Sequence, residues 1–254
     1  MNRVVSATPG ELVAHGEKAV SAVLPGGFLK QSFIDWPGHI AAVLYTTGCN
    51  MRCVYCHNPG LVRPELIRPY GAAECRRIAD WLVGNRNLLD GVVVSGGEPT
   101  LQRRLPGFLQ WLRSCGFRVK LDTNGTNPQL LEELLHEHLV DAVSMDLKAP
   151  LELEAHREVC GRGITSAMVD RISRSLELLQ AWDGEVEIRS TLFRPFHDHR
   201  AIREMYRSVT GTWTIQSYSP RVTLESMEAA PCEKEDILDM LGAGDDKAVG
   251  IRFR

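Results

Sequence analysis

Three cysteines in one short segment are the residues of this chain whose types and spacing point most clearly to chemistry. Cys49, Cys53 and Cys56 form a Cys-x3-Cys-x2-Cys pattern between Thr46 and Pro59. Thiolates are the usual ligands of iron–sulfur clusters, and three of them this close can bind three irons of a [4Fe–4S] cube. The fourth iron would then lack a protein ligand, so that a small molecule can bind and react there. The pattern therefore predicts a cluster that does chemistry as well as electron transfer.

Three other interpretations of this segment remain open from the residues alone. Cys53-Val-Tyr-Cys56-His57 matches the attachment sequence of c-type haem, which would leave Cys49 unexplained. A zinc site could use the cysteines and His57, although zinc sites usually draw ligand pairs from two separated segments. A thioredoxin-type redox pair would need only two cysteines. We expect the cluster because it uses all three.

Polar segments follow three further predicted strands, at Ser95–Pro99, Asp122–Gly125 and Asp146–Lys148. The adjacent glycines Gly96 and Gly97 permit positive φ angles and a close approach of the backbone to a ligand. Carboxylates at strand ends can accept hydrogen bonds from ribose hydroxyls or ammonium, or help to coordinate a cation. Structural salt bridges would explain the same charges, because charged residues of this kind mark functional sites only statistically.

Two more side chains are candidates for ligand contacts. Arg189, near a later strand, could bind a carboxylate with two parallel hydrogen bonds, or could instead pair with Glu187 or Asp146. Tyr55, beside the third cysteine, could pack against an adenine ring, or could simply anchor the loop by its apolar body and polar tip.

The elements that must position these residues alternate along the chain. Short apolar runs predict strands at His39–Thr46, Gly91–Ser95, Phe117–Asp122, Asp141–Asp146, Glu185–Leu192 and Thr212–Ser217. Longer amphipathic runs between them predict helices at Ala72–Gly84, Gln102–Cys115, Pro128–His138, Ser166–Trp182 and His199–Ser208. Strands and helices that alternate at this spacing predict parallel strands with crossover helices, and the functional residues then share the carboxyl edge of the sheet.

The fold class that follows is α/β, an open (β/α)6 partial barrel, because six units are too few to close a full (β/α)8 barrel. We expect an N-terminal extension over residues 1–27, the barrel over 28–220 and a C-terminal extension over 221–254 that packs on it. The first extension should hold a helix at Glu11–Val23 and lead into a strand. The second should hold a helix at Lys234–Leu241 and a strand at Gly250–Arg254.

Composition narrows the class of protein. With 254 residues, 44% of them hydrophobic, the chain can bury a sizeable core. A net charge of −3 gives no sign of a nucleic-acid partner. No apolar run approaches the roughly 20 residues that cross a bilayer, so we expect no membrane contact and a cytoplasmic protein. An odd total of seven cysteines, four of them scattered singly, also favours a reducing compartment over a disulfide framework.

Longer stretches resemble the radical S-adenosylmethionine (SAM) superfamily, and within it the activating enzymes of glycyl-radical enzymes. The likeness is greatest to the activating proteins of anaerobic ribonucleoside-triphosphate reductase, and it covers about residues 27–220. The matching segments are Gly27–Gly38, the cysteine segment with His57-Asn58-Pro59, Ser95–Pro99, Leu121–Gly125, Met145–Ala149, Glu187–Arg189 and Trp213–Gln216.

This resemblance implies a radical SAM oxidoreductase of the EC 1.97.1 type. One [4Fe–4S] cluster would be bound by Cys49, Cys53 and Cys56, which are the metal ligands and catalytic residues. The residues implied around SAM are Tyr55, Gly96, Gly97, Glu98, Asp122, Asn124, Asp146, Lys148 and Arg189. Asp146 matches a residue linked to a monovalent cation, but a histidine that some relatives carry is replaced near Gln216–Ser219, so the cation stays open.

The resemblance also implies partners. The chain would take one electron from a reduced flavodoxin or ferredoxin, cleave SAM, and abstract hydrogen from a glycine of a glycyl-radical enzyme, namely anaerobic ribonucleoside-triphosphate reductase. Asp35–Gly38 is the candidate segment for meeting the partner's glycine loop, or else is a tight turn before the first strand.

Two alternative functions remain. One is a radical SAM enzyme that acts on a small molecule, like the ring-contracting 7-carboxy-7-deazaguanine synthase. The other is a non-catalytic iron–sulfur protein for electron transfer or metal binding. A fourth cysteine ligand near the three would favour the latter, and the nearest candidate, Cys75, lies in a predicted helix where a buried thiol is the usual explanation.

Overall fold

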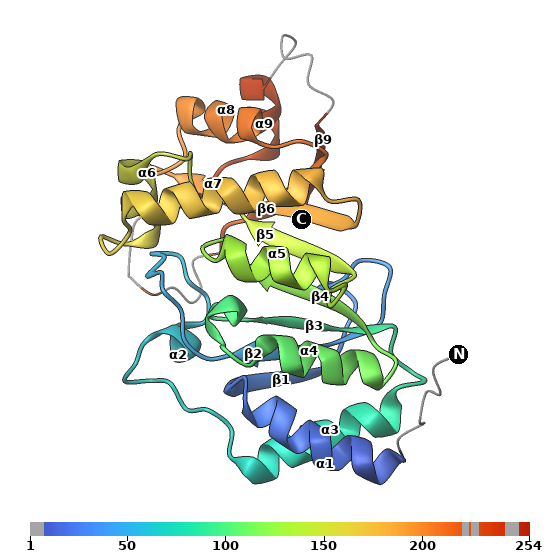
Figure 1. Cartoon of the computed structure of the whole chain (residues 1–254). Coiled ribbons are helices and arrows are strands. Elements are labelled where there is room, and N and C mark those ends of the chain that lie inside the picture. Colours follow the sequence, from blue (N-terminus) through green and yellow to red (C-terminus); the bar gives the residue numbers. More distant parts are fainter. Residues whose placement is uncertain (1–7, 220–223, 225–228, 242–248) are drawn as a thin grey trace.

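The computed structural model of the protein describes residues 8–219, 224, 229–241 and 249–254. Helices and strands alternate along most of this length (Figure 1). The strands are β1 (Pro25–Ser32), β2 (Ala41–Thr46), β3 (Gly91–Gly96), β4 (Arg118–Thr123), β5 (Ala142–Asp146), β6 (Glu185–Arg194), β7 (Thr212–Ser217), β8 (Ala230–Pro231) and β9 (Gly250–Phe253). The α-helices are α1 (Pro9–Ser21), α2 (Pro59–Val62), α3 (Ala72–Asn85), α4 (Leu105–Ser114), α5 (Pro128–His136), α6 (Leu153–Cys160), α7 (Ser166–Ala181), α8 (His199–Ser208) and α9 (Lys234–Leu241), with a 3₁₀ turn, η1, at Pro99–Leu101.

The strands form one curved sheet in the order β1-β2-β3-β4-β5-β6-β7-β9. The six predicted strands, β2 to β7, pair in parallel with their sequence neighbours. β1 pairs antiparallel with β2, and β9 extends the other edge parallel to β7. The short β8 pairs with β6 away from this path. The expected open α/β partial barrel is therefore confirmed.

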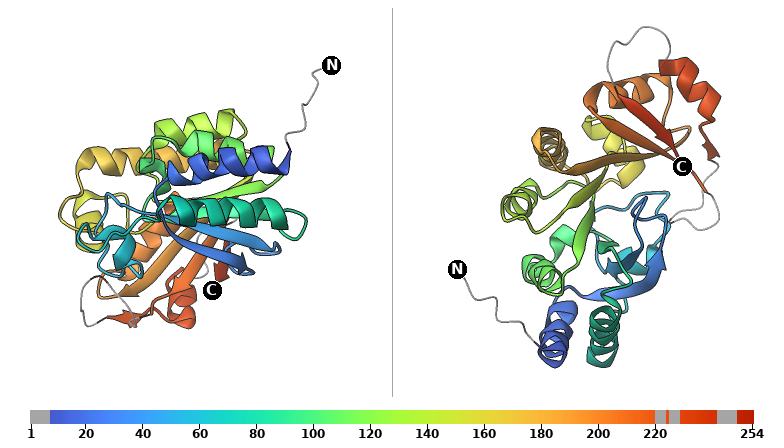
Figure 2. Two further views of the ribbon diagram at one scale, coloured as in Figure 1. Left: turned by 90° about the horizontal axis from the view of Figure 1, so that it is seen from below. Right: turned by 90° about the vertical axis from the view of Figure 1, so that its right-hand side faces the viewer.

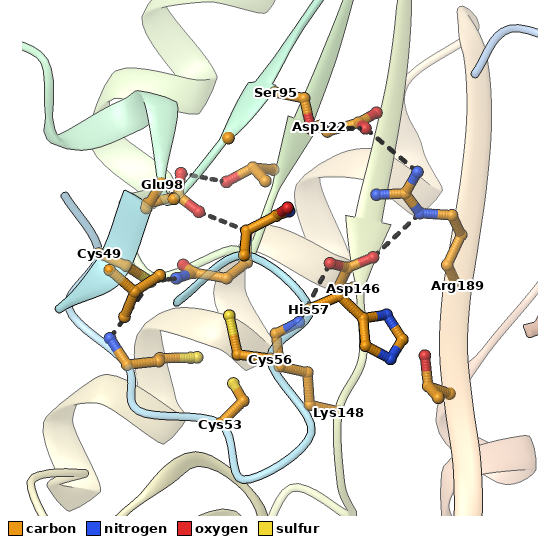
Figure 3. Close-up of a pocket in the computed structure, with 18 of the residues that line it drawn as sticks. Cys49, Cys53, Cys56, His57, Ser95, Glu98, Asp122, Asp146, Lys148 and Arg189 are labelled. Carbon is orange, nitrogen blue, oxygen red and sulfur yellow. Dashed lines mark hydrogen bonds and ion pairs between the residues drawn. The ribbon is translucent and has the colours of Figure 1, made fainter. Parts of the chain in front are cut away.

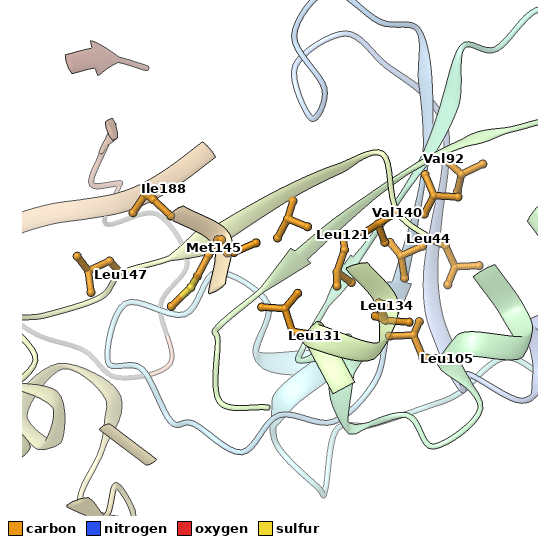
Figure 4. Close-up of a cluster of buried hydrophobic side chains, with 14 of the residues drawn as sticks. Leu44, Val92, Leu105, Leu121, Leu131, Leu134, Val140, Met145, Leu147 and Ile188 are labelled. Carbon is orange, nitrogen blue, oxygen red and sulfur yellow. The ribbon is translucent and has the colours of Figure 1, made fainter. Parts of the chain in front are cut away.

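Helices cover one face of the sheet, as the two views of Figure 2 show. Alternate strand residues point toward these helices, because successive side chains of a strand face opposite sides. Leu44, Val92, Leu121 and Met145 lie on this face and pack in a cluster with helix residues such as Leu134 (Figure 4). Full burial of each such side chain contributes about 1.5–3 kcal/mol, so this layer holds the strands in register.

The other face is concave and mostly polar, except at the amino ends of the strands. There Trp36, which is fully buried, packs with Ala41, Val43, Val93 and Ala142. Its indole N–H donates to Glu185 Oε1 at 3.1 Å. The segment before β2 thus closes the lower end of the concave face, and the polar side chains lie above it toward the carboxyl ends.

Some helix ends follow local chemistry that the sequence shows. The side chain of Asn127 accepts a hydrogen bond from Leu130 N at 3.3 Å and caps α5, whose first residue is Pro128. Thr8 and Glu11 form a capping box at the start of α1.

The structure also departs from the expected elements. The helix α6 was not expected, and the predicted helix at Gln102–Cys115 begins only at Leu105, after η1. β1 begins at Pro25, inside the expected N-terminal extension. Residues 1–7 and parts of 221–254 lie outside the described residues, and the three domain boundaries stay a prediction. Within the described part of the chain, no helix combines the length and apolarity needed to span a membrane.

Candidate functional site

One cavity at the carboxyl edge of the sheet is lined by every residue that the sequence predicts for the site. It has a volume of about 390 Å³ (Figure 3). The cysteine segment forms one wall, and the ends of β3 to β6 form the others. Residues far apart in the sequence meet here because parallel strands all end at the same edge. The individual roles of these residues stay predictions.

The cysteine segment is a loop between β2 and α2 that its own backbone holds in a compact turn. The amide of Cys56 donates to the carbonyl of Cys53 at 3.0 Å, and the amide of Met51 donates to Cys49 Sγ at 3.4 Å. The guanidinium of Arg52 donates to the carbonyl of Cys49 at 2.8 Å. Cys53 is buried, whereas Cys49 and Cys56 are half-buried. Among the described residues, no three His, Cys, Asp or Glu side chains are grouped so that they could hold a single metal ion.

Gly96, the last residue of β3, and Gly97 after it are required by contact with the start of the cysteine loop. Gly96 has a φ of +129°, and a Cβ on Gly97 would lie 2.0 Å from the carbonyl oxygen of Gly48. The amide of Gly97 donates to Thr46 O at 2.9 Å, and that of Glu98 donates to Gly48 O at 2.8 Å. The turn therefore fixes the cysteine loop, which is a structural use of the glycines that the sequence did not reveal.

Glu98 and Asn124 line the cavity, but most of their hydrogen bonds are to other groups of the protein. The buried Glu98 carboxylate accepts from Thr100 N, Thr100 Oγ1 and Thr123 Oγ1 at 3.0, 2.6 and 2.8 Å, and from Asn124 N at 2.7 Å. The Asn124 amide donates to Asn50 Oδ1 at 2.9 Å. These two side chains tie the ends of β3 and β4 to the cysteine loop.

Charged side chains from β4, β5 and β6 form a network on the opposite wall. Arg189 donates from Nε to Asp146 Oδ1 at 3.0 Å and from its terminal nitrogen to Asp122 Oδ2 at 3.2 Å. Lys148 Nζ donates to Asp146 Oδ2 at 3.1 Å and lies 3.5 Å from the hydroxyl of Tyr55. Figure 3 shows Arg189 reaching both carboxylates above the cysteine loop. Arg189 therefore forms the predicted ion pair with Asp146. Its second partner is Asp122 and not Glu187.

Burial and these charges set the ionisation of the site. Burial on its own would raise the pKa of Asp146, but the charges of Arg189 and Lys148 outweigh it and lower the pKa to about 2. Burial opposes the charge of Lys148, yet Asp146 and the neighbouring ionisable groups raise its pKa well above the usual value. Burial also raises the pKa of the Cys49 thiol to about 12. Asp146 and Lys148 thus stay ionised, whereas the Cys49 thiol stays protonated unless metal displaces the proton.

A second layer of polar residues lies beneath the network and is not among the residues that the sequence predicts for the site. Lys120, only 3% exposed, lies 3.7 Å from both Asp122 Oδ1 and Glu187 Oε2 and donates to the main-chain oxygen of Asp35. Tyr45 lines the cavity as well, and burial raises its pKa to about 12. The available signal was the period-two spacing of polar residues within otherwise apolar strands, which places Lys120 and Asp122 on one face.

The donors around the cavity fit a [4Fe–4S] cluster and SAM. The three cysteine sulfurs come from one loop, and Asp122 Oδ1 is buried without a hydrogen-bond partner. Lys120 Nζ, 3.7 Å away, compensates the charge of this oxygen without a hydrogen bond, so the oxygen can still accept one from a ligand hydroxyl or ammonium group. The cations of Arg189 and Lys148 suit a ligand carboxylate.

Comparisons with known proteins agree with this chemistry. The sequence profile of the Radical SAM superfamily matches residues 43–201. A protein of Methanocaldococcus jannaschii, provisionally named a glycyl-radical enzyme activating enzyme, is 32% identical over 223 residues, which cover 86% of this chain and 90% of the relative.

Two further relatives match only part of the chain. The pyruvate formate-lyase 1-activating enzyme of Escherichia coli K12 is 32% identical over 50% of this chain and 52% of its own. The 7-carboxy-7-deazaguanine synthase of Methanopyrus kandleri is 32% identical over 44% and 51%, respectively. The match thus spans about half of each of these relatives.

Solved structures share the fold at low sequence identity. A radical SAM methyltransferase from Sphaerobacter thermophilus superimposes with a TM-score of 0.62 at 13% identity, covering 86% of this chain and 67% of that one. SuiB of Streptococcus suis, bound to S-adenosylmethionine, gives 0.60 at 15% identity over 84% and 49%. With a profile match over more than half of its length, the chain belongs to the Radical SAM superfamily.

Proposed function

We propose that this radical SAM enzyme activates a glycyl-radical enzyme by abstracting hydrogen from one of its glycines. Membership of the superfamily implies a [4Fe–4S] cluster and SAM as cofactors. The observation that carries the proposal is the convergence of the three cysteines and the charged strand ends around one cavity. The relative from M. jannaschii, matched over 90% of its length, supports the choice of a glycyl-radical partner.

Each wall of the cavity has a part in this proposal. Cys49, Cys53 and Cys56 would bind three irons and leave the fourth for SAM. Arg189 and Lys148, both charged, would orient the carboxylate of SAM. Asp122 Oδ1, which is buried and has no hydrogen-bond partner, would accept from a ribose hydroxyl or contact the monovalent cation together with Asp146. When bound and reduced, the cluster supplies the electron that cleaves SAM into methionine and a 5′-deoxyadenosyl radical.

The residues near the cysteines would hold the rest of SAM. Tyr55 is buried, packs edge-on against Phe193 with ring centroids 5.1 Å apart, and lines the cavity. Its ring would contact the adenine. The Gly96–Gly97 turn would bind the methionyl amino group through main-chain atoms, while Glu98 holds that turn in place. The protein's contribution is orientation, because the position of the glycine relative to C5′ decides which hydrogen is removed.

The segment before β2 would meet the partner. Asp35 lines the cavity, and the preceding Phe33 and Ile34 are 67% and 70% exposed. Trp36, by contrast, is fully buried, so only part of the candidate segment Asp35–Gly38 can touch another protein. The partner's glycine loop would enter over Asp35, which lines the cavity.

The finer assignments follow the sequence resemblance. The partner would be anaerobic ribonucleoside-triphosphate reductase, the reductant a flavodoxin or ferredoxin, and the reaction of the EC 1.97.1 type. The protein would act in the cytoplasm with one cluster and without nucleic acid or membrane. All seven cysteines are free thiols in the structure.

Anaerobic reconstitution tests the proposal. The protein would be loaded with iron and sulfide and mixed with SAM, reductant and purified anaerobic ribonucleoside-triphosphate reductase. We expect a glycyl-radical doublet in electron paramagnetic resonance (EPR) together with 5′-deoxyadenosine. SAM cleavage without a doublet on any glycyl-radical enzyme tested would contradict the activase assignment.

A small-molecule radical SAM reaction is the alternative. The partial match to a 7-carboxy-7-deazaguanine synthase favours it, and that protein's substrate class can be tested directly. Formation of 7-carboxy-7-deazaguanine, without any glycyl radical, would support this alternative. A non-catalytic iron–sulfur protein would show the cluster but no SAM cleavage.

A further inference from the structure

A fourth cysteine, Cys160, lies against the cysteine loop although more than a hundred residues separate them in the sequence. It is the last residue of α6 and is 1% exposed. Its carbonyl accepts from Arg52 N at 2.8 Å, and the carbonyl of Val159 accepts from Val54 N at 3.0 Å. Both chain neighbours of Cys53 are therefore fastened to the end of α6, which holds Cys53 in a fixed position beside Cys160.

The next residue, Gly161, explains how the chain can leave α6 so close to the loop. Its φ is +96°, and a Cβ there would lie 3.0 Å from Arg52 Cβ and 3.2 Å from Arg52 O. A larger residue would push the end of α6 away from the loop. The close approach is thus built into the backbone and does not depend on the cysteine side chain alone.

Cys53 and Cys160 are both buried in the same cluster, and the main-chain hydrogen bonds of their neighbours place the two residues side by side. A cysteine sulfur bound to iron carries no proton, so between these two side chains only the Cys160 thiol can donate a hydrogen bond in the loaded site. Other thiols find main-chain partners: Cys75 donates to the carbonyl of Tyr70 and Cys232 to that of His197, both at 3.7 Å. Cys160 is thus the donor and Cys53 the acceptor.

Cys160 is also on the wrong side of Cys53 to be a cluster ligand. Cys53 lines the cavity, but Cys160 does not. Its thiol therefore lies behind Cys53, where it can contact the ligand sulfur but not an iron held within the cavity. The open iron of the proposed cluster keeps its free position.

We propose that the Cys160 thiol donates a hydrogen bond to the Cys53 ligand sulfur and thereby raises the reduction potential of the cluster. Hydrogen bonds to cluster sulfurs are among the factors that set these potentials, because they stabilise the added negative charge of the reduced form. The inference rests on the proposed cluster at Cys49, Cys53 and Cys56. It makes Cys160 a positioning and tuning residue, not a catalytic one.

Redox titration of the reconstituted protein, followed by EPR of the reduced cluster, tests this. At a fixed potential, Cys160→Ala should lower the ratio of reduced to oxidised cluster roughly two- to tenfold, the range of a net hydrogen bond of about 0.5–1.5 kcal/mol. Cys160→Ser keeps a donor and should restore much of the ratio. Cys75→Ala removes a buried thiol that lies away from the cysteine loop, and this variant should keep the wild-type ratio of reduced to oxidised cluster.

Further measurements separate the hydrogen bond from a packing effect. Cys160→Val fills the space without a donor, and should behave like Cys160→Ala. In the wild type, resonance Raman should show an iron–thiolate stretching shift on exchange into D₂O that both variants lose. Equal potentials in wild type, Cys160→Ala and Cys160→Val, or loss of an iron in these variants, would overturn the inference. If the wild type itself bound no four-iron cluster, the proposed function would fail instead.

Discussion

At the scale of single residues, the site is a set of charges that compensate one another. Arg189 links Asp122 to Asp146, and Lys148 adds a second cation beside Asp146. Buried ions of this kind are destabilising when a partner is removed, because the remaining charge loses its compensation. The network therefore both holds the ends of the strands and offers fixed charges to a ligand.

Arg189 provides a test of the two-carboxylate geometry. In Arg189→Lys a single ammonium cannot hold both Asp122 and Asp146 in the fork that guanidinium allows. We expect SAM affinity to fall about ten- to a hundredfold, equivalent to roughly 1.5–3 kcal/mol for bonds to charged groups, with the cluster retained. Equilibrium dialysis with labelled SAM measures this. Arg174→Lys, in an exposed pair with Glu177 at 3.3 Å, is the matched control and should bind normally. Normal affinity in Arg189→Lys would remove this residue from the SAM site.

Asp146 gives a prediction on pH. Its pKa in the folded chain is lowered from 3.8 to about 2, so its stabilising contribution is complete above 3.8 and is lost as the pH falls toward 2. The sign follows because the unfolded chain takes up the proton first. We expect the free energy of unfolding in urea to drop over this range in the wild type, and Asp146→Asn to be less stable near neutral pH but to show a shallower acid slope. Asp170→Asn, at an exposed position, should keep the wild-type slope. An unchanged slope in Asp146→Asn would contradict the assignment.

At the scale of elements, the turn after β3 is what positions the cysteine loop. Gly97→Ala would place a methyl group 2.0 Å from Gly48 O. This oxygen belongs to the main chain, which cannot move aside as the end of a flexible side chain can. We expect this variant to incorporate less than about a tenth of the wild-type iron, if the displacement costs roughly 1.5 kcal/mol or more, as strained backbone does. Iron and sulfide analysis after reconstitution measures the loss.

The helix α3 offers a matched control for this glycine. A Cβ on Gly84 would meet nothing within 4 Å, so Gly84→Ala should load the cluster normally and gain up to about 1 kcal/mol of stability. Full cluster loading in Gly97→Ala would show that the turn does not fix the loop.

The same scale shows what the sequence could and could not predict. Strands such as β7 and helices such as α8 have the predicted bounds because their apolar periodicity and caps are local signals. The helix α6 was missed because it has only eight residues and Glu152, the residue before it, makes no side-chain capping hydrogen bond. The site residues were found as strand-end motifs. Lys120 and Tyr45 were not, because their function depends on the concave face, which only the assembled sheet creates.

At the scale of the whole molecule, one segment connects the two ends of the partial barrel. Phe33 and Ile34 are exposed, Asp35 reaches the cavity, and Trp36 is buried at the amino ends of the strands. Lys120 binds the main chain of Asp35 from the sheet. An open barrel lacks the side chains that fill a closed one, so this segment supplies a substitute core for its inner face.

Trp36 is the centre of that substitute core, and its removal should lower the free energy of unfolding of the whole sheet. Its ring packs with residues of β2, β3 and β5, donates to Glu185 of β6, and lies 4.9 Å from the Arg118 guanidinium. Trp36→Ala should cost about 3–5 kcal/mol in urea unfolding. Trp36→Phe keeps most of the apolar contact and should lose less, since only the indole hydrogen bond and some volume disappear. Trp182→Ala, at a half-buried position after α7, is the control and should cost less than Trp36→Ala. Equal small losses in all three variants would mean that the strands hold their curvature without the segment before β2, because a true core residue cannot be truncated without leaving a cavity.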